Sequence, residues 1–92
     1  MNRNVVEMYE RALKVVLDEY GLTVEELFHS NRLDAVHART ALILPLSKLM
    51  SDSDIAMCTH MKRNSVCGVR NKHRGANAWD VCRCIDDVNA VL

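Results

Sequence analysis

The sequence predicts an all-α domain of five to six helices that contains a helix-turn-helix. The chain has only three Gly and one Pro in 92 residues, so few positions interrupt a helix. Apolar residues recur at three- and four-residue steps in each long segment, and polar residues suited to capping stand before most of them. With 49% hydrophobic residues, a chain of this length can bury one modest core, so we expect a single domain over residues 1–92.

The first half of the chain predicts three helices. Residues 4–20 carry one apolar stripe, and Gly21 follows as a left-handed cap. Thr23 and Glu26 form a capping box that predicts a short helix over residues 24–29, burying Leu27 and Phe28. Residues 32–50, capped by Asn31, are apolar on more than one face and should form the central helix. We expect Pro45 to kink this helix without ending it, because Leu46 and Leu49 continue its stripe.

Residues 77–92 predict the last helix, with Asn77 as its cap. Its apolar residues stand at three-residue steps and should close over the core: Trp79, Cys82, Ile85, Val88 and Val91.

A helix-turn-helix is predicted over residues 52–71, and a serine or aspartate among residues 51–54 should cap its first helix. Two short helices can pack steeply when the fourth, eighth, tenth, fifteenth and eighteenth positions of the motif are apolar and the fifth is small. The positions hold Ile55, Thr59, Met61, Val66 and Val69, with Ala56 as the small residue. Thr59 is the exception among them. The ninth position favours positive φ and usually holds Gly; here it is His60, in a corner made by residues 59–61.

Charge points to the second helix of this motif as a DNA-binding surface. The formal net charge is zero, but residues 60–75 hold five Lys and Arg and no Asp or Glu. Such a basic patch attracts phosphate even on a neutral molecule. We expect base-edge contacts from Lys62, Arg63, Asn64, Gly68 and Asn71. We expect phosphate contacts from Ser65, Arg70, Lys72, Arg74 and Arg32.

Other classes of function have weaker support. Four cysteines lack a CxxC spacing, so we expect reduced thiols that pack as small hydrophobes, and no metal or cofactor. His29, His37 and Cys67 fit no spacing of nucleophile and base, so we expect no enzyme and no small-molecule substrate. No apolar run could span a bilayer, and the charged N-terminal stretch does not look like a signal peptide. We therefore expect a cytoplasmic protein without a membrane partner.

Three stretches resemble the C-terminal DNA-binding domain of the bacterial replication initiator DnaA. They read YGLTVEELFHSNR, AVHARTALILPLSKL and SDSDIAMCTHMKRNSVCGVRNKH. The shared features are an arginine before the long helix (Arg32), an Ala-Arg step inside it (Ala38 and Arg39) and the helix-turn-helix. The resemblance covers about residues 4–74 and implies a DnaA-like or Trp repressor-like helical fold. The family's Gly-Gly-Arg-Asp-His-Thr-Thr signature is absent, with Met61 to Ser65 in its place, and the family's minor-groove loop is reduced to Arg32.

The leading expectation is a small protein that binds double-stranded DNA sequence-specifically. It would regulate transcription or assist replication or recombination, and similar domains occur as free-standing proteins in phages and mobile elements. One reading helix gives limited affinity, so a homodimer or a partner protein is expected. The alternative is a protein-interaction module that regulates a replication or transcription complex without reading DNA. The ATPase domain of an initiator is missing from this chain, so it is not expected to act as one.

Overall fold

Six helices form the regular structure in a computed structural model that describes residues 3–72 and 75–92. They are α1 (Arg3–Tyr20), α2 (Val24–His29), α3 (Leu33–Ser47), α4 (Asp52–Thr59), α5 (Arg63–Lys72) and α6 (Trp79–Val91). The described residues contain no strand, so the all-α prediction is confirmed. No helix in these two ranges has the length and apolarity needed to cross a membrane.

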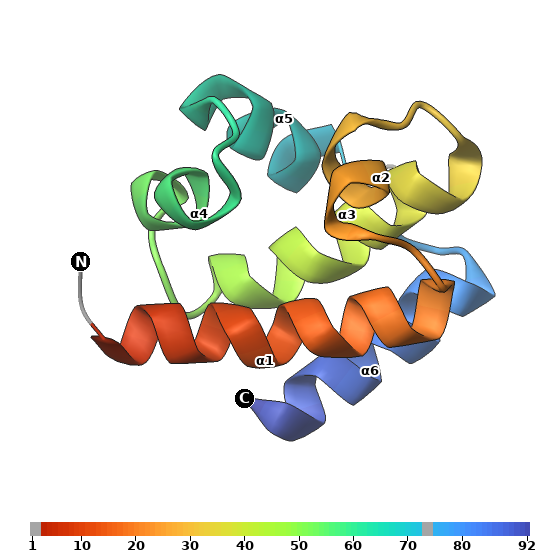
Figure 1. The fold of residues 1–92 in the computed structure, drawn as a ribbon, viewed down its shortest axis with the longest axis horizontal. Helices are drawn as coiled ribbons and strands as arrows, with labels where there is room; N and C mark the ends of the chain where they lie inside the picture. The colour runs from red at the N-terminus through yellow and green to blue at the C-terminus, as the bar shows by residue number, and fades with distance from the viewer. Residues whose placement is uncertain (1–2, 73–74) are drawn as a thin grey trace.

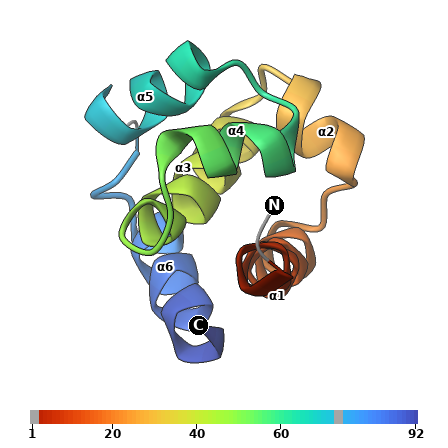
Figure 2. The same cartoon turned by 90° about the vertical axis from the view of Figure 1, so that its left-hand side faces the viewer.

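Helix α3 lies at the centre and packs against each of the other five helices. In Figure 1, α4 and α5 lie above α3, whereas α1 and α6 lie below it. Figure 2 shows the same separation from the side, with α2 flanking the upper layer. The two helices of the predicted motif therefore sit on the opposite side of α3 from α6.

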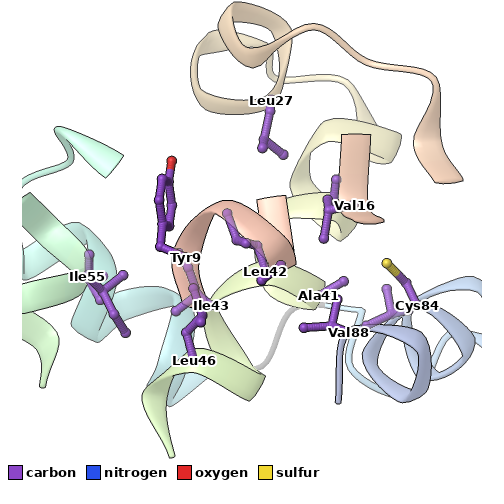
Figure 3. Close-up of a cluster of buried hydrophobic side chains, with 14 of the residues drawn as sticks. Tyr9, Val16, Leu27, Ala41, Leu42, Ile43, Leu46, Ile55, Cys84 and Val88 are labelled. Carbon is purple, nitrogen blue, oxygen red and sulfur yellow. The ribbon is translucent and has the colours of Figure 1, made fainter. Parts of the chain in front are cut away.

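The core forms where α3 meets the two layers. Leu42, Ile43 and Leu46 are fully buried on α3, and Figure 3 shows them between Ile55 of α4 and Val88 of α6. Burial of each such side chain contributes about 1.5–3 kcal/mol to stability. The prediction that this helix is the most buried one is confirmed, and its burial fixes the platform on which α4 and α5 rest.

Several helix ends form as the sequence predicts. Thr23 and Glu26 make the reciprocal capping box of α2, with both hydrogen bonds 3.1 Å long. Gly21 has φ of 64°, as a left-handed helix end requires. Ser51 caps α4 by accepting from the Asp54 N–H at 3.2 Å. Leu27 is fully buried, whereas Phe28 is only partly buried against the core.

The predicted start of α3 lies within one residue of the observed start, but its predicted cap and its predicted end are wrong. The helix begins at Leu33 after Arg32, which has no side-chain cap; the hydroxyl of Ser30, not Asn31, accepts from the Arg32 N–H. It ends at Ser47, because beyond Pro45 the Lys48 and Leu49 N–H groups bond three residues back. Pro45 thus stands in the last turn, and Leu49, half exposed, does not continue the buried stripe.

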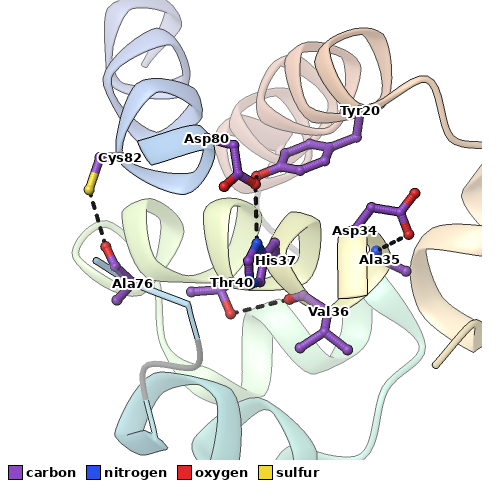
Figure 4. Close-up of polar contacts among 9 residues, drawn as sticks. All are labelled: Tyr20, Asp34, Ala35, Val36, His37, Thr40, Ala76, Asp80 and Cys82. Carbon is purple, nitrogen blue, oxygen red and sulfur yellow. Dashed lines mark hydrogen bonds and ion pairs between the residues drawn. The ribbon is translucent and has the colours of Figure 1, made fainter. Parts of the chain in front are cut away.

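The predicted face of α6 is correct for Val88 and partly for Ile85, but wrong for the other three residues. Residues at strict three-residue steps drift by about 60° per step around a helix of 3.6 residues per turn. The buried face is therefore Val81, Cys84 and Val88, at steps of three and four, while Trp79, Cys82 and Val91 are exposed. Ala78, not Asn77, is the cap residue. The expectation that the cysteines pack as small hydrophobes therefore fails for Cys82, whose thiol donates to the Ala76 carbonyl at 3.2 Å (Figure 4).

A polar cluster joins α1, α3 and α6. The Tyr20 hydroxyl donates to Asp80 Oδ2 at 2.8 Å, and His37 Nδ1 lies 3.2 Å from the same oxygen (Figure 4). Gly75, with φ of 70°, lies against the His37 ring so closely that a Cβ would come within 2.5 Å of it. These contacts hold Gly75 and the start of α6 against α3.

Candidate nucleic-acid interface

The corner between α4 and α5 has the backbone conformation that the motif needs. His60 adopts φ of 60° and ψ of 19°, the left-handed conformation expected at the ninth position. It is the one residue other than Gly with positive φ in the described ranges. The sequence prediction that a non-glycine takes this conformation here is confirmed.

Thr59, the polar exception among the motif's apolar positions, is buried and fully hydrogen-bonded. Its hydroxyl donates to the Ile55 carbonyl at 2.8 Å and accepts from the Met61 N–H at 3.2 Å. One side chain thus ties the last turn of α4 to the residue that leads into α5. A buried hydroxyl with both partners present adds to the rigidity of a corner that must hold two helices at a fixed angle.

Helix α5 is anchored by one face. Val66 is fully buried, and Val69 and Met61 pack against the core. The helix contacts α3 and α4 along this side. The opposite face points into solvent and carries Asn64, Gly68 and Asn71 at helical spacing, with both asparagines exposed. These three predicted base-edge residues therefore lie along one solvent-facing line of α5, which we call its crest.

Gly68 lies on this crest without a packing role. A Cβ built at this position meets no atom within 4 Å, so the fold does not require glycine here. A glycine inside a helix nevertheless costs about 1 kcal/mol relative to alanine. The bare backbone at Gly68 is the kind of surface that lets a ligand approach a helix closely.

The flank of α5 that faces α4 is occupied by an intramolecular contact. Arg70 donates to Asp52 Oδ2 at 2.8 Å, and the Cys67 thiol donates to the same oxygen at 3.0 Å. The pKa of Asp52 lies below its ordinary value. The hydrogen bond from the Cys67 thiol lowers it most, desolvation acts against this, and the charges of Arg70 and Arg63 lower it further. Arg70, predicted to bind phosphate, thus shares its charge with a carboxylate of its own chain.

The remaining predicted residues are spread around this helix. Lys62 stands in the turn before α5, Arg63 begins the helix and Lys72 ends it; all three are exposed and form no ion pair within residues 3–72 and 75–92. Ser65 is exposed in the first turn of α5. Arg32 lies in the α2–α3 connection and pairs with Asp34 at 2.8 Å. Arg74 lies outside the described residues.

A groove of about 1240 Å³ runs between α5 and α2. Its α5 side includes Lys62, Asn64, Ser65, Gly68 and Lys72, which are half of the predicted contact residues. The sequence analysis did not identify the other side of the groove, because nothing local in the sequence shows that α2 lies opposite α5. Its further lining residues are Tyr9, Val24, Glu25, Phe28, His29, Arg39, Thr40, Cys58, Thr59, His60, Met61 and Val69.

Two residues of the groove have roles that follow from burial. The Arg39 guanidinium donates to the carbonyls of Phe28 and Ser30 at 3.2 and 3.0 Å, which holds the C-terminal end of α2 on α3. Burial lowers the pKa of Arg39. Burial, with the nearby Cys58 and Glu10, raises the pKa of Tyr9 to about 12, so its hydroxyl stays neutral at physiological pH. The groove therefore has Lys62 and Lys72 on its α5 side and Glu25 on its α2 side, with the Arg39 guanidinium hydrogen-bonded between α2 and α3.

Comparisons of the chain with protein-family models, with curated proteins and with solved structures find no match. The resemblance to the initiator's DNA-binding domain therefore stays a prediction from the sequence.

Proposed function

We propose that this protein binds double-stranded DNA by placing α5 in the major groove. The observation that carries the proposal is the composition of the exposed surface of α5. It holds two asparagines and an open glycine along its crest, free cations at both ends and no acid. A ten-residue helix is about 15 Å long, and a major groove about 12 Å wide admits such a helix.

In this arrangement, the residues divide by the kind of contact they make. Asn64 and Asn71 present amide groups that match the donor and acceptor pair on an adenine edge. Gly68, between them, leaves room for the bases to come close to the helix backbone. Lys62 and Arg63 were expected at base edges from the sequence, but they stand beside the crest of α5. We therefore assign them, with Lys72, to contacts with the phosphates along the walls of the DNA major groove. Ser65 faces the α2 side and could donate to a phosphate there. We propose that a protein with these DNA contacts acts as a small transcriptional regulator or as an accessory factor in replication or recombination.

One such helix buries little surface, so tight binding needs a second DNA-contacting unit. DNA-binding domains of this size usually act as dimers on paired half-sites. We propose that the chain acts with a second copy or with a partner protein. Selection of bound sequences from a random duplex pool tests this directly. An enriched site, single or repeated with a fixed spacing, supports the proposal. A pool that remains random contradicts sequence-specific reading.

The groove between α5 and α2 favours a second candidate, a protein-interaction module. Tyr9, Phe28, Met61 and Val69 give the groove an apolar floor, which a DNA backbone would not use. If the groove binds a partner protein, Phe28→Ala should abolish binding of that partner. The same substitution should leave the affinity for random duplex DNA unchanged.

A further inference from the structure

The only tryptophan of the chain lies at the surface, on the side of α3 away from α5. Trp79 begins α6 and is 75% exposed, although tryptophan is large and apolar. Arg83, one turn later, lies over the indole with its Cζ 5.3 Å from the ring centroid. This cation–π contact covers one face of the ring, while most of the side chain stays open to solvent. Tryptophan has few rotatable bonds, so it loses little side-chain entropy on binding, and it is among the residues enriched at the centres of protein interfaces.

A hollow of about 520 Å³ lies beside the ring. Glu19 and Tyr20 line it from the end of α1, Asp34 from the start of α3, and Asp80 and Arg83 from α6. Its walls are held by the bond from Tyr20 to Asp80 shown in Figure 4. The hollow is therefore formed by three helix ends whose positions are fixed by hydrogen bonds.

The charge around this hollow is negative and only partly neutralised. Asp34 is paired with Arg32, and Asp80 is bonded by Tyr20 and His37. The group that acts on Glu19 is a second carboxyl group, that of Asp87. The pKa of Glu19 is raised. Desolvation is the largest cause, a hydrogen bond and the charge of Asp87 add to it, and Arg83 acts in the opposite direction. Trp79, Arg83 and Asp87 follow one another at four-residue steps, so they share one side of α6, and Glu19 lines the same hollow as Trp79 and Arg83. A cation added near these carboxyl groups would be stabilised.

These features disfavour two kinds of occupant. Nucleic acid could stack a base on Trp79, but the carboxylates would repel its phosphates. A second copy of the chain, related by a two-fold axis, would place the same acidic surface against itself. It would also point the two α5 helices away from each other, because α5 lies across α3 from α6 (Figures 1 and 2).

We propose that Trp79, Arg83, Glu19 and Asp87 form a docking surface, the Trp79 surface, for a lysine- or arginine-rich segment of a partner protein. An apolar side chain of that segment packs on the open face of the indole. A neighbouring ammonium or guanidinium group lies between Glu19 and Asp87. Helix α5 remains uncovered in this complex, so the proposal does not rest on DNA binding by α5, and one molecule could hold both partners.

A peptide titration tests the proposal on the full chain. The probe is a fluorescein-labelled 15-residue peptide in which lysines alternate with leucines at helical spacing, and the readout is anisotropy at low salt. We expect Trp79→Ala to weaken binding about tenfold or more, because the truncation removes the aromatic side chain on which the peptide's apolar residue packs. We expect Glu19→Gln to weaken it roughly threefold, while Glu10→Gln, the same charge change at another exposed position of α1, leaves it unchanged.

Two further measurements distinguish the surface from general attraction of a basic peptide. A peptide with serine at each leucine should bind at least about tenfold more weakly, since it lacks the apolar anchor. In the unmodified protein, acrylamide quenching of the single tryptophan should fall when the leucine peptide binds. The proposal is overturned if the peptide does not bind, if quenching is unchanged on binding, if the leucine and serine peptides bind equally, or if Glu10→Gln weakens binding as much as Glu19→Gln.

Discussion

Arg70 in α5 donates a hydrogen bond to Asp52 in the first turn of α4, with 2.8 Å between Nη2 and Oδ2. The contact divides the surface of α5 into a bonded flank and a free crest. On the bonded flank, Arg70 and the Cys67 thiol converge on one carboxylate. On the crest, Asn64, Gly68 and Asn71 face solvent. The charge of the helix-turn-helix therefore depends on its first helix as well as on its second.

Asp52→Asn should strengthen DNA binding. The substitution removes a negative charge next to α5 and releases Arg70 from its ion pair, so the affinity for duplex DNA at low salt should rise roughly two- to fivefold. The fluorescence anisotropy of a labelled duplex of random sequence measures this affinity. Asp18→Asn on α1 removes an equal charge far from α5 and should have little effect. An unchanged or lower affinity in folded Asp52→Asn would show that this flank does not face DNA.

Gly68→Ala should separate stability from binding. The added methyl group meets no neighbour, and alanine favours a helix over glycine, so the free energy of unfolding should rise by about 0.5–1 kcal/mol. Binding to duplex DNA should weaken, because the methyl group stands on the crest. Urea unfolding and anisotropy on the same preparation measure the two effects. A more stable variant with unaltered affinity would mean that bases do not approach this position.

His60→Gly should stabilise the corner, and His60→Val should destabilise it. A side chain in the left-handed conformation costs roughly 1 kcal/mol, which glycine relieves and a β-branched residue increases. Part of the gain is offset because glycine also makes the unfolded chain more flexible. Thermal unfolding of the three proteins should give the order glycine, histidine, valine. Another order would indicate that the His60 side chain makes a stabilising contact.

Asp80 should contribute to stability at neutral pH and lose that contribution in acid. Burial raises the pKa of Asp80, but the hydrogen bonds from Tyr20 and His37 outweigh it, so the pKa lies below the ordinary value of 3.8. Since the folded state holds the proton more weakly than the unfolded state, this stability is present above the unfolded pKa and falls as pH drops through the folded one. Urea unfolding between pH 7 and pH 2 should show a shallower decline in Asp80→Asn, whereas Asp86→Asn, exposed on the same helix, should follow the parent protein.

Local signals in the sequence predicted much of the fold. The Thr23 capping box, the Ser51 cap and the Gly21 helix end each depend on residues within one turn, and each forms as predicted. The corner at Thr59 and His60 follows from the spacing of the motif. These features are local, so one sequence suffices to predict them.

Some errors were local: Asn31 and Asn77 are not the caps, and strict three-residue steps do not follow one face of α6. Others arose where the structure depends on distant contacts. The burial of α6 is set by its packing on α1 and α3, which selects Val81 and Cys84 over Trp79 and Cys82. The ion pair between Asp52 and Arg70 joins residues from two helices, and the wall that α2 places opposite α5 has no local signal. The polar crest of α5, by contrast, could be predicted because Val66 and Val69 define the buried face.

The salt dependence of DNA binding tests the central claim most directly. Affinity for a random duplex is measured between 50 and 300 mM salt for the parent protein, for Lys72→Ala and for Lys14→Ala on α1. We expect the logarithmic slope to become shallower by about 0.9 in Lys72→Ala, as for the loss of one phosphate contact, and to stay unchanged in Lys14→Ala. No binding at low salt, or the same slope in all three proteins, would contradict placement of α5 in the major groove.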